Sequence, residues 1–243
     1  MSVVLTVIPA RGGSKGVPQK NLRKIAGKPV VVYSVEAALA AKSAGQVLVS
    51  SDSDDILKTA KVSDKVIALK RPDELAGDKT PILPVYRHAV EEYEKKSGKK
   101  VDYLIGLEPT TPFRNPEDID GCVKKAIESK ADVIVSVKST AENPYFVLIE
   151  PRADDPQWFE QSKRCDATRR QDAPPVFTIN GAVYVFTRQT LFTVENLYQA
   201  KRLGVYEMPW ERSVDLDSED DFKFAEFLAA RQSSVQKSPS GKL

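Results

Sequence analysis

VVLTVIPARGGSKGVPQKN, residues 3–21, is the stretch that determines how this chain folds. It begins as a continuous apolar, β-branched run, which is typical of a strand buried on both faces. The run ends in a loop that contains three glycines and three cationic side chains: Gly12, Gly13, Gly16, Arg11, Lys15 and Lys20. Glycines can adopt positive φ and turn backbone N–H groups toward an anion. The stretch therefore predicts a first strand that leads into a polyphosphate-binding loop.

Two known phosphate-binding motifs do not fit this loop. The P-loop spacing G-x-x-x-x-G-K-[ST] is absent, and the dinucleotide fingerprint G-x-G-x-x-G cannot be aligned with residues 10–21. From composition alone, the alternative is a plain surface turn in which the glycines relieve strain and the lysines aid solubility.

Composition and charge restrict the class of protein. At 243 residues, with 41% hydrophobic and 8% aromatic residues, the chain is long enough for a large α/β domain with a substantial core. Its formal net charge of +2, from 36 cationic and 34 anionic side chains, argues against a nucleic-acid-binding protein. The chain starts with a strand rather than a signal peptide, and no apolar run approaches membrane-spanning length. We expect a soluble cytoplasmic protein without nucleic-acid or membrane partners.

Cysteine and histidine contribute little chemistry. Cys122 and Cys165 match neither zinc nor redox spacing, which predicts reduced thiols. His88, the one histidine, falls in a helical pattern over residues 81–96 and is expected on the surface of that helix. A Ser–His or Cys–His mechanism would have to use this residue, so we set such mechanisms aside.

Strand and helix patterns alternate through the first half of the chain. This alternation predicts parallel βαβ units and an α/β fold with a Rossmann-like, mostly parallel central sheet and flanking helices. After the first strand, further strands are expected at residues 46–50, 65–69, 102–107, 132–137, 181–187 and 203–208. Helices are expected at residues 30–44, 56–61 and 81–96, from residue 115 onward, and at 217–231.

The pattern changes near Lys138. Residues 139–178 lack a long helical period but contain Trp158, Phe159 and Phe177, which indicates a smaller subdomain or long excursion rather than a linker. One α/β domain would then comprise residues 1–138 and 179–231. Residues 232–243 are rich in Ser, Lys and Gln and are predicted to be disordered.

Two acidic groups are candidates for metal binding. Asp215 and Asp217 are separated by one residue, so in an extended segment both carboxylates point to the same face. This suits Mg²⁺, which binds through one or two carboxylates plus substrate phosphates. The alternative is that Asp217 caps a helix beginning near Ser218. For residues 51–55 (SDSDD), the favoured interpretation is the cap and acidic first turn of the next helix, rather than a metal site.

Five patches carry a more specific signal. They are IPARGGSKGVPQKN (8–21), RPDELA (71–76), EPTTPFR (108–114), RQ followed by NGAVY (170–171 and 180–184), and VDLD (214–217). In this order they resemble the motifs of the CMP-sialic acid synthetases (acylneuraminate cytidylyltransferases), a family that includes synthetases of other CMP-nonulosonic acids. The resemblance implies transfer of CMP from CTP to the anomeric hydroxyl of a 2-keto sugar acid, with release of pyrophosphate.

The resemblance also implies roles for individual residues. The nucleotide would be bound by Ala10, Arg11, Gly12, Gly13, Ser14, Lys20, Asn21 and Arg71. The catalytic residues would be Arg11, Lys20, Asp215 and Asp217, of which the two aspartates would hold Mg²⁺, with Mn²⁺ as a substitute. The acidic sugar would contact Glu108, Thr110, Arg170, Gln171, Asn180 and Tyr184, with Arg170 on its carboxylate. The family's counterpart of residues 139–178 projects, mediates dimerisation and reaches toward the partner's active site, so we expect a homodimer.

The chain departs from the family pattern on the sugar side. Glu108 stands where sialic acid synthetases usually have glutamine, and a carboxylate there would repel an acidic sugar unless it binds metal or receives a substrate hydroxyl. Tyr145, Phe146 and Val147 follow Pro144 where a lysine is expected. N-acetylneuraminic, legionaminic and pseudaminic acid all stay open as acceptors. A nucleotidyltransferase that uses another NTP or a sugar phosphate is one alternative function, and a catalytically silent nucleotide-binding dimeric module is another.

Overall fold

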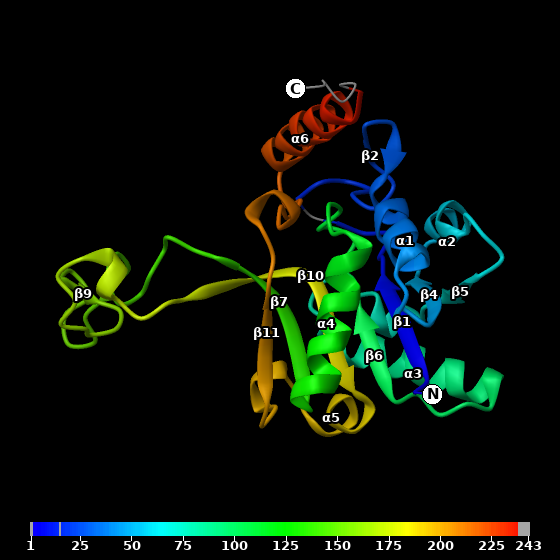
Figure 1. Cartoon of the computed structure of the whole chain (residues 1–243), viewed down its shortest axis with the longest axis horizontal. Coiled ribbons are helices and arrows are strands. Elements are labelled where there is room, and N and C mark those ends of the chain that lie inside the picture. The colour runs from blue at the N-terminus through cyan, green and yellow to red at the C-terminus, as the bar shows by residue number, and fades with distance from the viewer. Residues whose placement is uncertain (1, 15, 238–243) are drawn as a thin grey trace, which may run out of the picture.

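The computed structural model describes residues 2–14 and 16–237, and a seven-stranded sheet forms the centre of this region (Figure 1). The strands lie in the order β11-β7-β10-β6-β1-β4-β5. Their bounds are β1 (Val4–Pro9), β4 (Gln46–Ser51), β5 (Val66–Lys70), β6 (Tyr103–Gly106), β7 (Val133–Ser139), β10 (Phe177–Thr187) and β11 (Leu203–Glu207). β10 is antiparallel to both neighbours, and the other adjacent pairs are parallel. The predicted Rossmann-like, mostly parallel sheet is confirmed.

β1 lies inside the sheet because its side chains are apolar toward both faces. Leu5 and Val7 belong to the hydrophobic cluster on one face, and Ile8 belongs to the cluster on the other. β1 pairs with β4 on one side and β6 on the other, both parallel. The carboxyl ends of β1, β4, β5 and β6 therefore open on one edge of the sheet, which is where ligands bind in open α/β folds.

Helices cover both faces and the carboxyl edge of the sheet (Figure 1). Their bounds are α1 (Val30–Ala40), α2 (Asp54–Ala60), α3 (Ile82–Ser97), α4 (Pro116–Ser129), α5 (Arg188–Thr193) and α6 (Glu219–Lys237), with short 3₁₀ turns η1 (Asp73–Leu75), η2 (Arg170–Asp172), η3 (Leu197–Gln199) and η4 (Trp210–Arg212). α1, α2 and α4 pack on the face that contains Ile8, and α3 and α5 pack on the face that contains Leu5. α6 contacts the hairpin of β2 (Lys24–Ile25) and β3 (Lys28–Pro29) beyond the carboxyl edge.

Residues 140–176 leave the sheet as an arm that projects away from it (Figure 1). Near its tip, β8 (Ile149–Pro151) and β9 (Phe159–Gln161) form an antiparallel pair. β10, which brings the chain back, begins four residues before the strand predicted from residue 181. The sequence pattern is interrupted there because Gly181 has a φ of +70° and the pairing register with β7 shifts between Ile179 and Tyr184.

α1 ends at Ala40, so its predicted end at residue 44 is wrong. The carboxylate of Asp120 on α4 accepts hydrogen bonds from the backbone N–H groups of Lys42 and Ser43, at 3.2 and 2.8 Å. These bonds from a distant helix satisfy N–H groups that a longer α1 would have used internally.

α6 is assigned as far as Lys237, so residues 232–237 of the predicted disordered tail continue this helix, and the predicted disorder of residues 232–243 stays a prediction. This stretch contains neither glycine nor proline, and a helix with no such breaker continues from its preceding turns. Residues 238–243 lie outside the described residues.

Cys122 and Cys165 are free thiols, as their spacing predicted, and Cys122 lies on the buried side of α4. His88 lies on α3 and is half-buried. Over residues 2–14 and 16–237, no helix is both long enough and apolar enough to cross a membrane.

We expect Asp118→Ala to lower the free energy of unfolding by about 2–4 kcal/mol. The Asp118 carboxylate is fully buried and accepts a hydrogen bond from the backbone N–H of Asn115 at 2.9 Å. It also accepts bonds from Nε and Nη2 of Arg212, both at 2.9 Å, so its loss removes a helix cap and leaves Arg212 without its carboxylate. Chemical denaturation measures the change. The exposed neighbour Glu117 is the control, and an equal loss in Glu117→Ala would contradict the assignment.

Candidate active site

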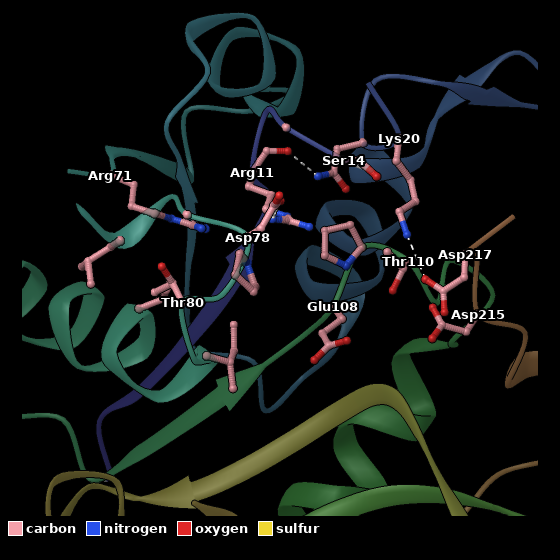
Figure 2. Close-up of a pocket in the computed structure, with 18 residues that line it drawn as sticks. Arg11, Ser14, Lys20, Arg71, Asp78, Thr80, Glu108, Thr110, Asp215 and Asp217 are labelled. Atoms are coloured by element: carbon pink, nitrogen blue, oxygen red, sulfur yellow. Dashed lines mark hydrogen bonds and ion pairs between the residues drawn. The ribbon is translucent and has the colours of Figure 1, made fainter. Parts of the chain in front are cut away.

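A cavity of about 280 Å³ opens where β1, β5 and β6 end (Figure 2). Ten residues that the sequence predicted for the site line this cavity: Arg11, Gly13, Ser14, Lys20, Asn21, Arg71, Glu108, Thr110, Asp215 and Asp217. They come from segments far apart in the sequence. The cavity lies at the edge where open α/β sheets bind their ligands, so it is the candidate active site.

The loop after β1 packs closely on the loop after β4. The backbone N–H of Gly12 donates a hydrogen bond to Oδ1 of Asp52 at 2.8 Å, and Gly12 does not line the cavity. Gly12 and Gly13 do not adopt the positive φ that we expected. The missing side chain matters at Gly12 for another reason, because a Cβ there would lie 3.1 Å from the Cβ of Ser53.

The acidic residues 51–55 form the start of α2, as the favoured interpretation predicted. Oγ of Ser53 caps the helix by accepting a hydrogen bond from the backbone N–H of Ile56 at 3.4 Å, and Asp54 and Asp55 lie in its first turn. Within residues 2–14 and 16–237, no cluster of three or more His, Cys, Asp or Glu side chains is arranged to hold a metal ion by itself.

Lys20 and Asn21 are fixed at the cavity by polar contacts. Nζ of Lys20 lies 3.0 Å from Oδ1 of Asp217 (Figure 2). Nδ2 of Asn21 donates a hydrogen bond to the carbonyl oxygen of Arg11 at 2.8 Å. Oδ1 of Asn21 is buried and has no hydrogen-bond donor among the described residues. A buried acceptor of this kind is costly unless a ligand or water satisfies it.

The two arginines of the cavity have different environments. Arg71 is buried and donates hydrogen bonds to Oγ and the carbonyl oxygen of Ser50, at 3.2 and 2.7 Å. Burial lowers the pKa of this guanidinium, although Asp52 opposes the shift. Arg11 has a side chain that is 35% exposed and forms an ion pair with Asp78. Arg71 is therefore a fixed part of the wall, whereas Arg11 can change its partner.

Arg114 anchors the segment that carries Glu108. Its buried guanidinium donates hydrogen bonds to the carbonyl oxygen of Ala182 at 2.7 Å, to Oγ of Ser34 at 2.5 Å, and to the carbonyl oxygen of Glu108. Burial lowers the pKa of Arg114 to about 10, and the charge of Glu108 opposes this shift. These bonds fix the backbone at the end of β6 and hold the Glu108 side chain at the cavity.

Asp215 and Asp217 enter the cavity on either side of a buried residue. The side chain of Leu216 is fully buried, and its backbone N–H donates a hydrogen bond to the carbonyl oxygen of Thr110 at 2.9 Å. Both carboxylates consequently face the cavity, as their spacing predicted (Figure 2). The side chain of Ser218 accepts a hydrogen bond from the backbone N–H three residues on, at 3.3 Å, so it caps α6 in place of Asp217.

Three carboxyl groups share this end of the cavity: Glu108, Asp215 and Asp217. Removal from water and the charge of Asp215 raise the pKa of Glu108 from 4.5 to about 7, against the opposing charge of Arg114. Partial removal from water also raises the pKa of Asp215, although a hydrogen bond from Thr110 opposes it. The cavity thus holds negative charge that its own cations do not fully compensate.

Ala10 and Asn180 are buried and do not line the cavity. The backbone N–H of Ala10 donates to the carbonyl oxygen of Ser50 at 2.9 Å. Nδ2 of Asn180 donates to Oγ of Ser213 at 2.8 Å, and its Oδ1 accepts from Oγ of Ser136 at 2.6 Å. Asn180 therefore ties β10 to β7 and to the segment that leads into Asp215, instead of facing a ligand.

Three further predicted sugar-binding residues lie elsewhere. Tyr184 lines a neighbouring, mostly apolar cavity of about 170 Å³ together with Tyr86 and Phe186. Arg170 and Gln171 lie in η2 on the projecting arm, away from the cavity of their own chain (Figure 1).

The structure adds a segment that sequence analysis did not single out. It follows the patch RPDELA, of which Leu75 also lines the cavity, and its lining residues are Gly77, Asp78, Thr80, Ile82 and Val85. They follow β5 and lead into α3, so they lie at the same carboxyl edge as the other motifs. The available signal was the position of this segment after a predicted strand, because residues 77–81 contain no motif of their own.

Comparison with known proteins identifies the family. A family model described as "Cytidylyltransferase" matches residues 5–216. The chain is 34% identical over 228 residues to "Post-translational flagellin modification protein B" of Campylobacter coli and to "CMP-N,N'-diacetyllegionaminic acid synthase" of Campylobacter jejuni, covering 94% of this chain and 95% of each relative. Its fold is similar to that of CMP:2-keto-3-deoxy-manno-octonic acid synthetase complexed with CTP, with a TM-score of 0.68 and 19% identity over 95% of this chain and 100% of that chain. With its site motifs inside or at the end of the matched region, the chain belongs to the cytidylyltransferase family, among the CMP-nonulosonic acid synthetases that it resembles.

Proposed function

We propose that this chain transfers CMP from CTP to the anomeric hydroxyl of a nonulosonic acid and releases pyrophosphate. One observation carries the proposal. The phosphate-binding loop and the Asp215–Asp217 segment, which lie at opposite ends of the sequence, meet in one cavity through the 3.0 Å contact of Lys20 with Asp217. The family supports cytidylyl transfer over a nucleotidyltransferase for another NTP and over a silent binding module.

Arg11, Ser14 and Lys20 would hold the triphosphate and the leaving pyrophosphate. The guanidinium of Arg11 can contact two phosphate oxygens at once, whereas Lys20 supplies a mobile point charge. Asn21 offers a buried oxygen acceptor that a donor group of the nucleotide can satisfy. Transfer of this kind depends on positioning and charge stabilisation, which the cavity provides without a histidine.

Asp215 and Asp217 would hold Mg²⁺, or Mn²⁺ in its place, together with phosphate oxygens of CTP. Two hard oxygen donors on one face suit this ion, and the uncompensated negative charge beside Glu108 favours a cation there. When bound, the ion neutralises charge on the α-phosphate and lowers the pKa of the attacking hydroxyl. Lys20 would then exchange its contact with Asp217 for one with phosphate.

Glu108 faces the acceptor side of the reaction. With a pKa of about 7, its carboxyl group is only partly ionised at neutral pH and repels an acidic sugar less than an ordinary glutamate would. The same value suits a group that accepts the proton or a hydrogen bond of a sugar hydroxyl.

The arm supports a homodimer in which each chain completes the other's site. Ile149, Trp158 and Phe159 on the arm are 65%, 60% and 57% exposed, and large exposed apolar groups gathered in one region are typical of an interaction surface. Arg170 lies on the same arm, far from the cavity of its own chain. We infer that the arm crosses to the second chain and brings Arg170 to the carboxylate of its acceptor.

N,N'-diacetyllegionaminic acid is our first candidate acceptor, because a relative of matching length is named as the synthase of its CMP derivative. The apolar residues 145–147, in place of the expected lysine, also argue for an acceptor that differs from N-acetylneuraminic acid. The CTP substrate and the free thiols favour the cytoplasm as its compartment.

Pyrophosphate release should be observed with CTP, Mg²⁺ and one nonulosonic acid, and not with the other three NTPs. Asp215→Asn should reduce kcat by at least about a hundredfold, because it removes a metal-binding charge without changing the side chain's shape. The matched control is Asp220→Asn, an exposed residue on α6 whose carboxylate contacts Lys223. Turnover with a different NTP or a sugar phosphate would discard the donor or acceptor assignment. Absence of turnover, with CTP still raising the melting temperature, would favour a binding module.

Glu108→Gln should raise the melting temperature of the ligand-free protein by about 2–5 °C at pH 8, with little gain at pH 5. Folding raises the pKa of Glu108 from 4.5 to about 7, so the folded chain binds this proton more tightly than the unfolded chain. The free energy of unfolding due to this group therefore falls as pH rises from about 4.5 to about 7. Thermal unfolding in EDTA tests this, with exposed Glu74→Gln as control. If the gain in melting temperature does not depend on pH, the pKa of Glu108 in the folded chain is that of an ordinary carboxyl group.

Mixing two inactive variants tests the crossed dimer. Arg170→Ala and Asp215→Asn should each inactivate a homodimer, but a mixed dimer contains one site with both native residues. After exchange of subunits, activity should return to about a quarter of the wild-type value, because half of the dimers have one working site of two. Steady-state assay of the mixture measures this. Failure to recover activity, with mixed dimers shown by differently tagged chains, would place Arg170 in its own chain's site.

A further inference from the structure

In the free chain, both cations proposed for the triphosphate already have a carboxylate partner. Lys20 pairs with Asp217 and Arg11 pairs with Asp78, and all four side chains line the cavity (Figure 2). A phosphate that binds either cation must therefore replace a carboxylate. After the exchange, the carboxylate of Asp217 would bind the proposed metal ion. Metal binding does not explain why Asp78 lies beside Arg11.

Asp78 belongs to a different part of the cavity from the other carboxylates. It lies in residues 76–81, between η1 and α3, and Figure 2 shows it beside Arg11, whereas Asp215 and Asp217 lie beyond Lys20. The side chains of Arg11 and Asp78 are 35% and 38% exposed. Water therefore reaches this ion pair, and an exposed pair of this kind can exchange partners at low cost.

The charge of the cavity shows why an exchange is needed. Among its described lining residues, the cations are Arg11, Lys20 and Arg71, and the carboxylates are Asp78, Glu108, Asp215 and Asp217. With these charges the cavity is not positive, although the proposed substrate carries several negative charges. A metal ion at Asp215 and Asp217 would compensate one end. At the other end, Asp78 must leave Arg11 for phosphate to approach it.

We propose that Asp78 is a displaceable counter-ion of Arg11, which phosphate replaces on binding and which returns as pyrophosphate leaves. This inference rests on the proposed function, since it concerns the phosphate that Arg11 would hold. Because Asp78 competes for Arg11, it weakens binding of every ligand that uses this arginine, including the product pyrophosphate. CMP offers no phosphate beyond the α-position, so it gains nothing from the loss of Asp78. Asp78 thus assists turnover by limiting retention of pyrophosphate.

The experiment compares wild type with Asp78→Asn, Asp78→Ala and Glu74→Gln, using calorimetric titration with CTP, pyrophosphate and CMP in the presence of Mg²⁺. Glu74 is an exposed carboxylate of the neighbouring turn η1 that does not line the cavity, so its removal reports long-range charge alone. Both Asp78 variants should bind pyrophosphate and CTP about two- to fivefold more tightly, with CMP affinity unchanged. The gain should shrink at 0.5 M salt, where the ion pair in the wild type is itself screened. In steady state, inhibition by pyrophosphate should strengthen by the same factor.

Several results would overturn the inference. Weaker binding of CTP in both Asp78 variants would show that Asp78 orients Arg11 within the complex. If the Asp78 variants bind CMP and pyrophosphate more tightly by the same factor, general charge repulsion is the cause. The same holds if Glu74→Gln changes the affinities as much as the Asp78 variants do. Unchanged affinities would show that Arg11 is not exchanged, and would leave the proposed function intact if CTP still binds. If no variant binds CTP or pyrophosphate, the proposed function fails together with the inference.

Discussion

The buried guanidinium of Arg114 is the interaction on which the candidate site depends. A buried cation is tolerated only when its donors are satisfied, and here they reach Ala182 of β10, Ser34 of α1 and the backbone of Glu108. One side chain therefore joins the antiparallel strand, a covering helix and the end of β6. Each of these elements borders the cavity or supports a residue that does. A lysine could not replace Arg114, because a single ammonium group cannot reach three acceptors in different directions.

Around this anchor, the cavity is organised by paired opposite charges rather than by a surplus of positive charge. The two cations proposed to bind the triphosphate, Arg11 and Lys20, each have a carboxylate partner from a distant segment, as Lys20 has in Asp217. Such pairs orient the cations before the ligand arrives, and orientation prepared in advance reduces the cost of ordering them on binding. The same pairs make binding an exchange of partners. In the proposed reaction, affinity for phosphate would be a difference between two ionic interactions, which would allow a highly charged substrate to bind and a charged product to leave.

The sequence predicted the fold well, and it also predicted residues that line one cavity, for reasons that are local. The strand in residues 3–9, its loop, and the alternation at Asp215 and Asp217 are patterns that a strand and its end impose over a few positions. The errors have distant causes. α1 stops early because Asp120 of another helix binds its trailing N–H groups. Asp78 belongs to no motif, and only the folded chain brings it beside Arg11.

Motif resemblance also failed to separate residues that face a ligand from residues that hold the scaffold. Asn180 lies in a matching motif, but its amide is fully used between Ser136 and Ser213. A scaffold residue and a ligand-binding residue can be equally specific in sequence, and only the hydrogen-bond partners distinguish them.

The two halves of the proposed reaction are built by different means. The nucleotide half uses strand ends, buried anchors and paired charges within one chain, so its geometry is rigidly determined by the sheet. The acceptor half would combine Glu108 with residues such as Arg170 from a projecting arm, which has few contacts with the sheet. If Arg170 acts as proposed, changes on the arm would alter which sugar is accepted without disturbing the bonds that form the cavity. A chain built in this way can keep one transfer chemistry while its acceptor changes, and for that reason the nucleotide motifs alone do not identify the sugar.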